Sequence, residues 1–243
     1  LVMGPAVTQT EQIFDAYWNS GLALPADKLS PLRDPDAALA KVVPQLAAPR
    51  PGAQAYLERI AQRLALFDPE ATQPDWTPTA RILADPPEKA LGKKGENWLM
   101  RELLPVFGAT RQRIEITSPY FIPGDEGTAA LAALAERGVR VSILTNSLAA
   151  TDVAAVHGGY APYRIPLLEA GVKLWELRPE PTGRAFSLRG SSSASLHTKA
   201  FTADGKTGFI GSMNLDPRSV SLNTEMGVLF DCPTITPKME AVW

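Results

Sequence analysis

Residues 196–214, LHTKAFTADGKTGFIGSMN, form the stretch that decides both the fold and the chemistry expected of this chain. The pattern predicts strands over residues 196–203 and 207–211, separated by a turn at Asp204 and Gly205. Residues two apart on a strand share a face, so His197 and Lys199 should present an imidazole and an ammonium side by side. Beyond the second strand, a turn carries the hydroxyl of Ser212 and the amide of Asn214.

Helix and strand patterns alternate through the residues before this stretch. Helices are predicted over residues 98–107, 129–137 and 163–170, and strands over 113–118, 139–144, 172–177 and 225–230. Gly138 and Gly171 follow two of the helices in the position that favours glycine. Alternating elements followed by a strand-rich end predict an α/β fold with a mixed central sheet flanked by helices.

The first 95 residues have a different character. A helix is predicted over residues 8–19, and the Pro- and Ala-rich stretches 21–52 and 68–90 should be loops or short helical pieces. One amphipathic helix is predicted between these stretches, from Leu57, Ile60, Leu64 and Phe67. We therefore divide the chain into an opening segment, residues 1–24, a connector, 25–95, and a catalytic domain, 96–243.

Composition narrows the class of protein. The chain has 243 residues, a formal net charge of -2 and a pI of about 5.8, a balance that argues against nucleic-acid binding. Cys232 is the one cysteine, so no internal disulfide is expected. No run approaches the ~18–20 apolar residues of a membrane span, and residues 1–5 have no signal-peptide pattern.

The polar residues suit attack on a phosphodiester. Such attack builds negative charge on the phosphoryl oxygens, and the donors of Lys199, Asn214 and Ser212 suit that charge. His197 can accept or donate a proton near neutral pH, and Glu225 is the candidate to orient its ring. No group of His, Cys, Asp and Glu has metal-ligand spacing, so we expect neither a metal nor another cofactor.

These residues resemble the phospholipase D superfamily, whose pattern is HxKxxxxD followed by GSxN. His197, Lys199, Asp204 and Asn214 match it without a gap, and Glu225 falls where that family keeps a glutamate that orients the histidine. The wider sequence resembles bacterial cardiolipin synthases, especially the ClsC-like branch, in residues 118–123, 145–152 and 216–219. Residues 1–20 resemble the segment that follows the first such motif in those proteins.

The resemblance implies a phospholipase D-like α/β sandwich in which two motifs face each other across a pseudo-two-fold axis. One histidine attacks phosphorus and forms a phosphohistidine, the other protonates the leaving alcohol, and Asp204 is a structural acid. The implied activity is phosphatidyl transfer that makes cardiolipin. The implied lipid substrates are phosphatidylglycerol and phosphatidylethanolamine. The implied location is the cytoplasmic side of a bacterial inner membrane, to which the protein binds peripherally.

The chain departs from the family in carrying one motif. His157 lacks the accompanying lysine and asparagine, so we expect the first motif on a preceding part of the protein, with the pairing of two copies as the alternative. His157 either lines a headgroup pocket or caps a turn, and Tyr120 is either core or pocket wall; with Ser212 they are the candidate substrate-binding residues. Alternative functions are a phospholipase D or other phosphodiesterase, a nuclease, or a non-catalytic half that binds phosphate.

Overall fold

The computed structural model describes residues 2–25, 28, 34–47, 58, 61, 75–93, 98–178 and 195–241. The chain forms two compact units, residues 1–20 with 77–243, and residues 21–76. The smaller unit contains helix α3 (Pro35–Ala47), which includes Pro44. The four apolar residues that predict an amphipathic helix within 57–67 lie outside the described residues.

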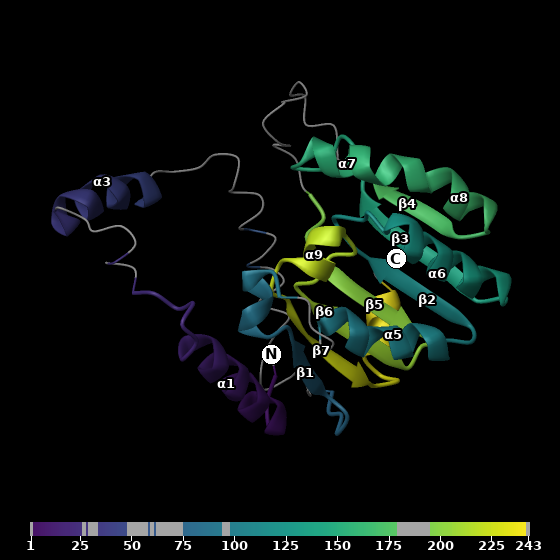
Figure 1. Cartoon of the computed structure of the whole chain (residues 1–243), viewed down its shortest axis with the longest axis horizontal. Helices are drawn as coiled ribbons and strands as arrows, with labels where there is room; N and C mark the ends of the chain where they lie inside the picture. Colours follow the sequence, from purple (N-terminus) through teal and green to yellow (C-terminus); the bar gives the residue numbers. More distant parts are fainter. Residues whose placement is uncertain are drawn as a thin grey trace. The chain divides into compact units, whose positions relative to one another are not determined.

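A seven-stranded mixed sheet forms the centre of the larger unit (Figure 1). Its strands lie in the order β1 (Arg81–Ala84), β7 (Met226–Asp231), β6 (Thr207–Gly211), β5 (Lys199–Ala203), β2 (Arg113–Thr117), β3 (Arg140–Asn146) and β4 (Lys173–Leu177). Strands β2, β3 and β4 are parallel, and the other pairs are antiparallel. The prediction of an α/β fold with a mixed sheet is confirmed.

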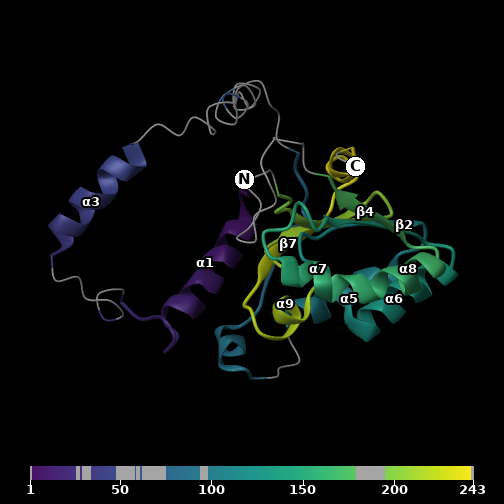
Figure 2. The ribbon, with the colours of Figure 1, turned by 90° about the horizontal axis from the view of Figure 1, so that it is seen from above.

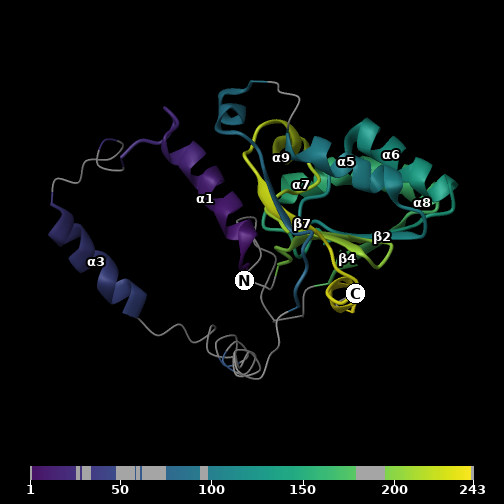
Figure 3. The same ribbon diagram turned by 90° about the horizontal axis from the view of Figure 1, so that it is seen from below.

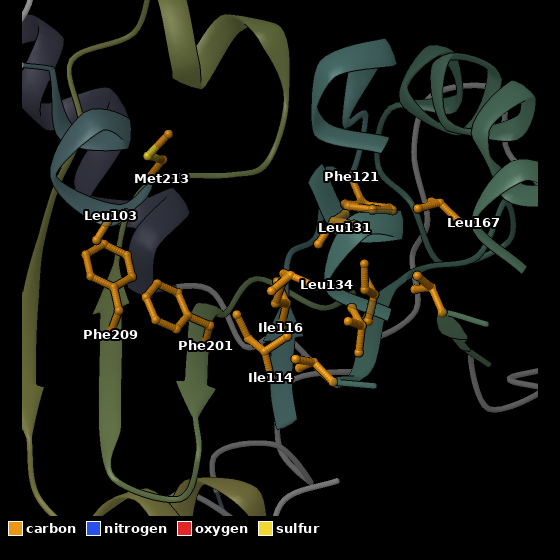
Figure 4. Close-up of a cluster of buried hydrophobic side chains, with 14 of the residues drawn as sticks. Leu103, Ile114, Ile116, Phe121, Leu131, Leu134, Leu167, Phe201, Phe209 and Met213 are labelled. Carbon is orange, nitrogen blue, oxygen red and sulfur yellow. The ribbon is translucent and has the colours of Figure 1, made fainter. Parts of the chain in front are cut away.

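Helices cover one face of this sheet, as two opposite views show (Figures 2 and 3). They are α5 (Leu99–Ala109), α6 (Gly124–Glu136), α7 (Ala154–Tyr160), α8 (Arg164–Glu169) and α9 (Pro217–Ser221), with the 3-10 turns η2 (Pro87–Leu91) and η3 (Ala161–Tyr163). The apolar core lies beneath them, where Phe201 stacks on Phe209 beside Ile114 and Ile116 of β2 (Figure 4). This core fixes β5 and β6, the two strands that carry the predicted motif.

Two helices contact other parts of the sheet. Helix α10 (Thr236–Glu240) lies on the opposite face, where the Thr236 hydroxyl donates to the Gly205 carbonyl at 2.6 Å. Helix α1 (Pro5–Trp18) lies against β1, where the Gln9 side chain accepts from the Ile82 N–H at 2.8 Å. No helix in the described part of the chain is long and apolar enough to cross a bilayer.

Several elements differ from the sequence predictions, among them α6, which begins at Gly124 rather than at residue 129, and α7, which was not predicted. Residues 81–84 form strand β1, where we expected a loop or short helix, because pairing with β7 supplies the hydrogen bonds that so short an apolar run cannot specify by itself. Helix α1 begins at Pro5 rather than at residue 8, since proline suits the first turn of a helix. Strand β5 begins at Lys199, so His197 lies just before the strand rather than inside it.

The strand directions create a site at one edge of the sheet. The carboxyl ends of β2, β3 and β6 meet the amino ends of β5 and β7 there. Tyr120 follows β2, Asp152 follows β3, Lys199 begins β5 and Asn214 follows β6. Side chains from four separate parts of the chain therefore converge at this edge.

Candidate active site

A cavity of about 1140 Å³ lies at this edge. Its lining includes four residues of the predicted motif, His197, Lys199, Ser212 and Asn214. Tyr120, which we expected to be either core or pocket wall, also lines it. The structure thus brings these five side chains together, but it places Asp204, Glu225 and His157 outside the cavity lining.

Lys199 is buried beside an exposed His197. Its ammonium donates to the backbone carbonyl of His197 at 2.7 Å, and this bond fixes the two residues relative to each other. Burial lowers the pKa of Lys199, while nearby carboxylates oppose that effect, chiefly Glu225 and then Asp152. One hydrogen bond uses one of the three ammonium protons, so the group retains donors for a ligand.

Asn146, at the end of β3, clamps the segment that precedes His197. Its buried side-chain amide accepts from the N–H of Leu196 at 3.0 Å and donates to the carbonyl of Leu196 at 3.2 Å. The paired bonds hold the backbone of Leu196 as a neighbouring strand would. Asn146 lies in a stretch that resembles cardiolipin synthases, but its local sequence did not predict this role.

The buried carboxylate of Glu225 is bound by two serine hydroxyls. Ser212 donates to one oxygen at 2.6 Å, and Ser219 donates to the other at 2.8 Å. The backbone N–H of Asn214 in turn donates to the Ser219 hydroxyl at 3.3 Å. The hydrogen bonds of the described residues include none between Glu225 and His197. In this geometry Glu225 holds the loop that carries Asn214.

The side-chain oxygen of Asn214 is buried and has no hydrogen-bond partner among the described residues. A buried polar atom without a partner is costly, and such atoms in native proteins are few. Because Asn214 lines the cavity, its amide group can bind a ligand there.

A buried ion pair holds Glu225 and Ser219, the residues that position the loop carrying Asn214. Asp85 and Lys89 lie 2.6 Å apart, and both side chains are 0% exposed. The Asp85 carboxylate also accepts from the N–H groups of Leu99 at 2.7 Å and Glu225 at 2.9 Å. Lys89 donates to the carbonyl of Ser219 at 2.8 Å. This pair was not predicted, because its one local signal in the sequence is an acid and a base four residues apart.

Tyr120 and Asp152 form a second polar pair, at the cavity wall. The phenol of Tyr120 donates to the two carboxylate oxygens of Asp152 at 2.8 and 2.9 Å. Burial raises the pKa of Tyr120 to about 12, aided by this hydrogen bond and the Asp152 charge. Tyr120 is held in turn by Ser118, whose hydroxyl donates to the Tyr120 carbonyl and accepts from the Leu215 N–H.

Asp204 lies at the far end of β5, roughly 16 Å from Lys199 for five residues of extended strand. It has a positive φ of 53°, and its carboxylate accepts from the backbone N–H groups of residues 111–113 at 2.8 to 3.0 Å. Burial raises the pKa of Asp204, but these three N–H bonds outweigh it and the pKa is lowered. Asp204 therefore acts on the start of β2 and not on a ligand in the cavity.

His157 lies on α7, where its ring meets Tyr160 edge-on with centroids 5.7 Å apart. Its Nδ1 atom is buried without a described hydrogen-bond partner. It does not line the cavity, so this position gives no support to a headgroup role. In the described part of the chain, no group of three or more His, Cys, Asp and Glu could hold a metal ion.

Comparisons with known proteins identify the family of the domain. A family model described as the phospholipase D-like domain of cardiolipin synthase matches residues 103–242. Cardiolipin synthase C of Escherichia coli is 48% identical over 165 residues, which cover 66% of this chain and 35% of that protein. Cardiolipin synthase A of Proteus mirabilis is 32% identical over 136 residues, which cover 56% of this chain and 25% of that protein. The chain therefore spans about a third of the length of its Escherichia coli relative.

A solved structure shares the fold. The phospholipase D family member Nuc from Salmonella typhimurium aligns with a TM-score of 0.50 at 18% identity, covering 69% of this chain and 92% of that one. At this identity the likeness shows the fold alone. The predicted phospholipase D-like fold is confirmed.

Proposed function

This chain belongs to the family of cardiolipin synthase phospholipase D-like domains, and from that premise we propose that it supplies one half of a phosphatidyltransferase active site. The observation that carries the proposal is the convergence of His197, Lys199 and Asn214 on one cavity. A histidine, a cation and a neutral amide are the groups that transfer of a phosphoryl centre requires.

The proposed reaction proceeds in two steps. One histidine attacks the phosphorus of a phosphatidyl lipid, and the bond from phosphorus to the leaving oxygen breaks as a second histidine donates a proton to that oxygen. The second histidine then takes the proton of an incoming alcohol, whose oxygen attacks the phosphohistidine and releases the first histidine. With water in place of the alcohol, the same steps give hydrolysis.

His197 is one of these two histidines. Its exposed imidazole suits a second half-site that closes over the cavity, carried on another part of the protein or on a second copy. Lys199 and Asn214 stabilise the charge that develops on the phosphoryl oxygens. Glu225 and Ser219 hold Asn214 in place through the bonds described above.

We propose phosphatidylglycerol and phosphatidylethanolamine as the lipids, with cardiolipin as the product. The name of the Escherichia coli relative, cardiolipin synthase C, supports this choice. Lipid substrates imply work at a membrane surface, and we propose peripheral association with the cytoplasmic side of a bacterial inner membrane.

The test is a lipid assay on the full-length protein in vesicles of phosphatidylglycerol and phosphatidylethanolamine. We expect cardiolipin to form with the native protein and to fall below detection with His197→Ala and Lys199→Ala. The matched control is Lys173→Ala, because Lys173 is an exposed lysine of β4 outside the cavity lining. Circular dichroism checks that each variant is folded.

Each outcome decides between the alternatives. Retained activity in His197→Ala or Lys199→Ala would refute the site assignment. Phosphatidic acid in place of cardiolipin would make the protein a hydrolase with the same chemistry. Failure of the native protein to form either product would favour the non-catalytic, phosphate-binding alternative. EDTA is expected to leave the native rate unchanged.

A further inference from the structure

We propose that Asp152 determines which alcohol reacts at this site, by binding a hydrogen-bond donor of the headgroup other than the reacting oxygen, and that Tyr120 positions it. The donor is a hydroxyl or an ammonium group. The inference rests on the proposed function and adds to it the feature of the alcohol that is recognised.

Asp152 is the one carboxylate among the described residues that line the cavity. The other two acids that act on Lys199 are buried and bound by protein donors. Glu225 accepts from two serine hydroxyls, and one oxygen of Asp216 accepts from two backbone N–H groups at the start of α9. Asp152, by contrast, is exposed, and it lines the cavity.

The pair with Tyr120 leaves most of this carboxylate available. A phenol has one proton to donate, whereas a carboxylate has about four acceptor positions. The phenol oxygen lies 2.8 and 2.9 Å from the two carboxylate oxygens, so its single proton can satisfy only one acceptor position at a time. Because the pKa of Tyr120 is raised to about 12, the phenol remains the donor at physiological pH. Tyr120 therefore fixes the carboxylate without satisfying it.

A carboxylate in a cavity for an anionic phosphodiester repels that substrate unless it meets a donor. Lys199 and Asp152 give the cavity one cationic and one anionic group, which suits an alcohol with a phosphate at one position and a donor at another. A site built to hydrogen-bond a substrate group discriminates strongly against an analogue that lacks the group. We therefore expect glycerol or ethanolamine to react better than propan-1-ol, which has no second donor.

The experiment measures phosphatidyl transfer by the full-length protein from phosphatidylglycerol vesicles to added glycerol, ethanolamine and propan-1-ol, with the glycerol isotope-labelled so that its product differs from the donor lipid. Asp152→Ala should lower kcat/KM for the donor-bearing alcohols about tenfold relative to kcat/KM for propan-1-ol, since one bond to a charged group is lost at an exposed position. The ratio is the readout because the Asp152 charge also acts on Lys199 and can change the rate with every alcohol. The matched control is Asp125→Ala, an exposed aspartate on α6 outside this cavity, which should not change the ratio.

Two further variants identify the donor and test positioning. Asp152→Asn keeps an acceptor oxygen without the charge. Compared with Asp152→Ala, it should therefore recover part of the kcat/KM for glycerol but little of the kcat/KM for ethanolamine. Tyr120→Phe should lower the same selectivity ratio about threefold in native protein. It should have no further effect in the Asp152→Ala background, a result that a general packing defect would not give.

Equal losses with donor-bearing alcohols and propan-1-ol, or an unchanged ratio, would overturn the role of Asp152 and leave the proposed function standing. If the native protein transfers phosphatidyl groups to none of the three alcohols and also makes no cardiolipin, both proposals are wrong.

Discussion

Lys89→Met tests how strongly the buried ion pair stabilises the site. Methionine has nearly the length and volume of the lysine stem, so the change removes the charge and leaves little cavity. Asp85 then keeps its two backbone donors but loses its counter-ion at 2.6 Å, and the Ser219 carbonyl loses a donor. Removal of one member of a buried pair costs about 3–5 kcal/mol. The free energy of unfolding of a globular domain is about 5–15 kcal/mol, so Lys89→Met should remove a large fraction of it.

Equilibrium unfolding in urea, followed by tryptophan fluorescence, measures this loss. Trp98 is a useful reporter because the Lys89 ammonium lies 5.1 Å from its ring centroid. With a slope of about 3 kcal/mol per molar urea, a loss of about 4 kcal/mol moves the midpoint down by about 1.3 M. The matched control, Lys93→Met, replaces an exposed lysine and should change stability by less than about 0.5 kcal/mol.

The double variant separates loss of the ion pair from loss of packing. Asp85→Asn in the Lys89→Met background removes the uncompensated charge. The double variant should therefore lose less stability than the sum of the two single variants, by at least about 1 kcal/mol. If Lys89→Met costs no more than Lys93→Met, or if Lys89→Met and Asp85→Asn are strictly additive, the ion pair does not stabilise the site.

Three other substitutions have expected outcomes in the same unfolding assay. Gly227→Ala should cost about 1–3 kcal/mol of stability, because a Cβ there would lie 2.4 Å from the ring of Phe209. Gly108 is an exposed residue of α5 where a Cβ would meet nothing within 4 Å, so Gly108→Ala should stabilise the protein by up to about 1 kcal/mol. Asp204→Asn should cost about 1 kcal/mol of stability at pH 7, because the pKa of Asp204 is lowered in the folded protein. This difference between native protein and variant is fully present above the ordinary aspartate pKa of about 3.9, and it is lost as the pH falls through the folded pKa. Ser219→Ala removes a buried hydroxyl that bridges a carboxylate and a backbone N–H, so it should cost about 1–3 kcal/mol, against less than about 0.5 for exposed Ser221→Ala.

The sequence by itself determined the fold class and the centre of the site. His197 and Lys199 lie two residues apart, and Ser212 and Asn214 follow a short turn and one strand, so local spacing already places them near one another. The alternation of helices and strands is also a local property, since each element follows from the periodicity of its own residues. These features were predictable because no distant part of the chain is needed to specify them.

Only the tertiary structure decided what surrounds and supports that centre. Asp85 meets Glu225 across 140 residues of sequence, and β1 is a strand only because β7 lies beside it. The order of strands brings Asp152, after β3, to the same edge as Lys199, at the start of β5. The hydrogen-bond partners of Glu225, the hydroxyls of Ser212 and Ser219, were also decided by the tertiary structure, because a carboxylate binds whichever donors the folded chain places beside it. Such contacts depend on sheet order and on the directions of strands distant in sequence, which local residue patterns do not specify.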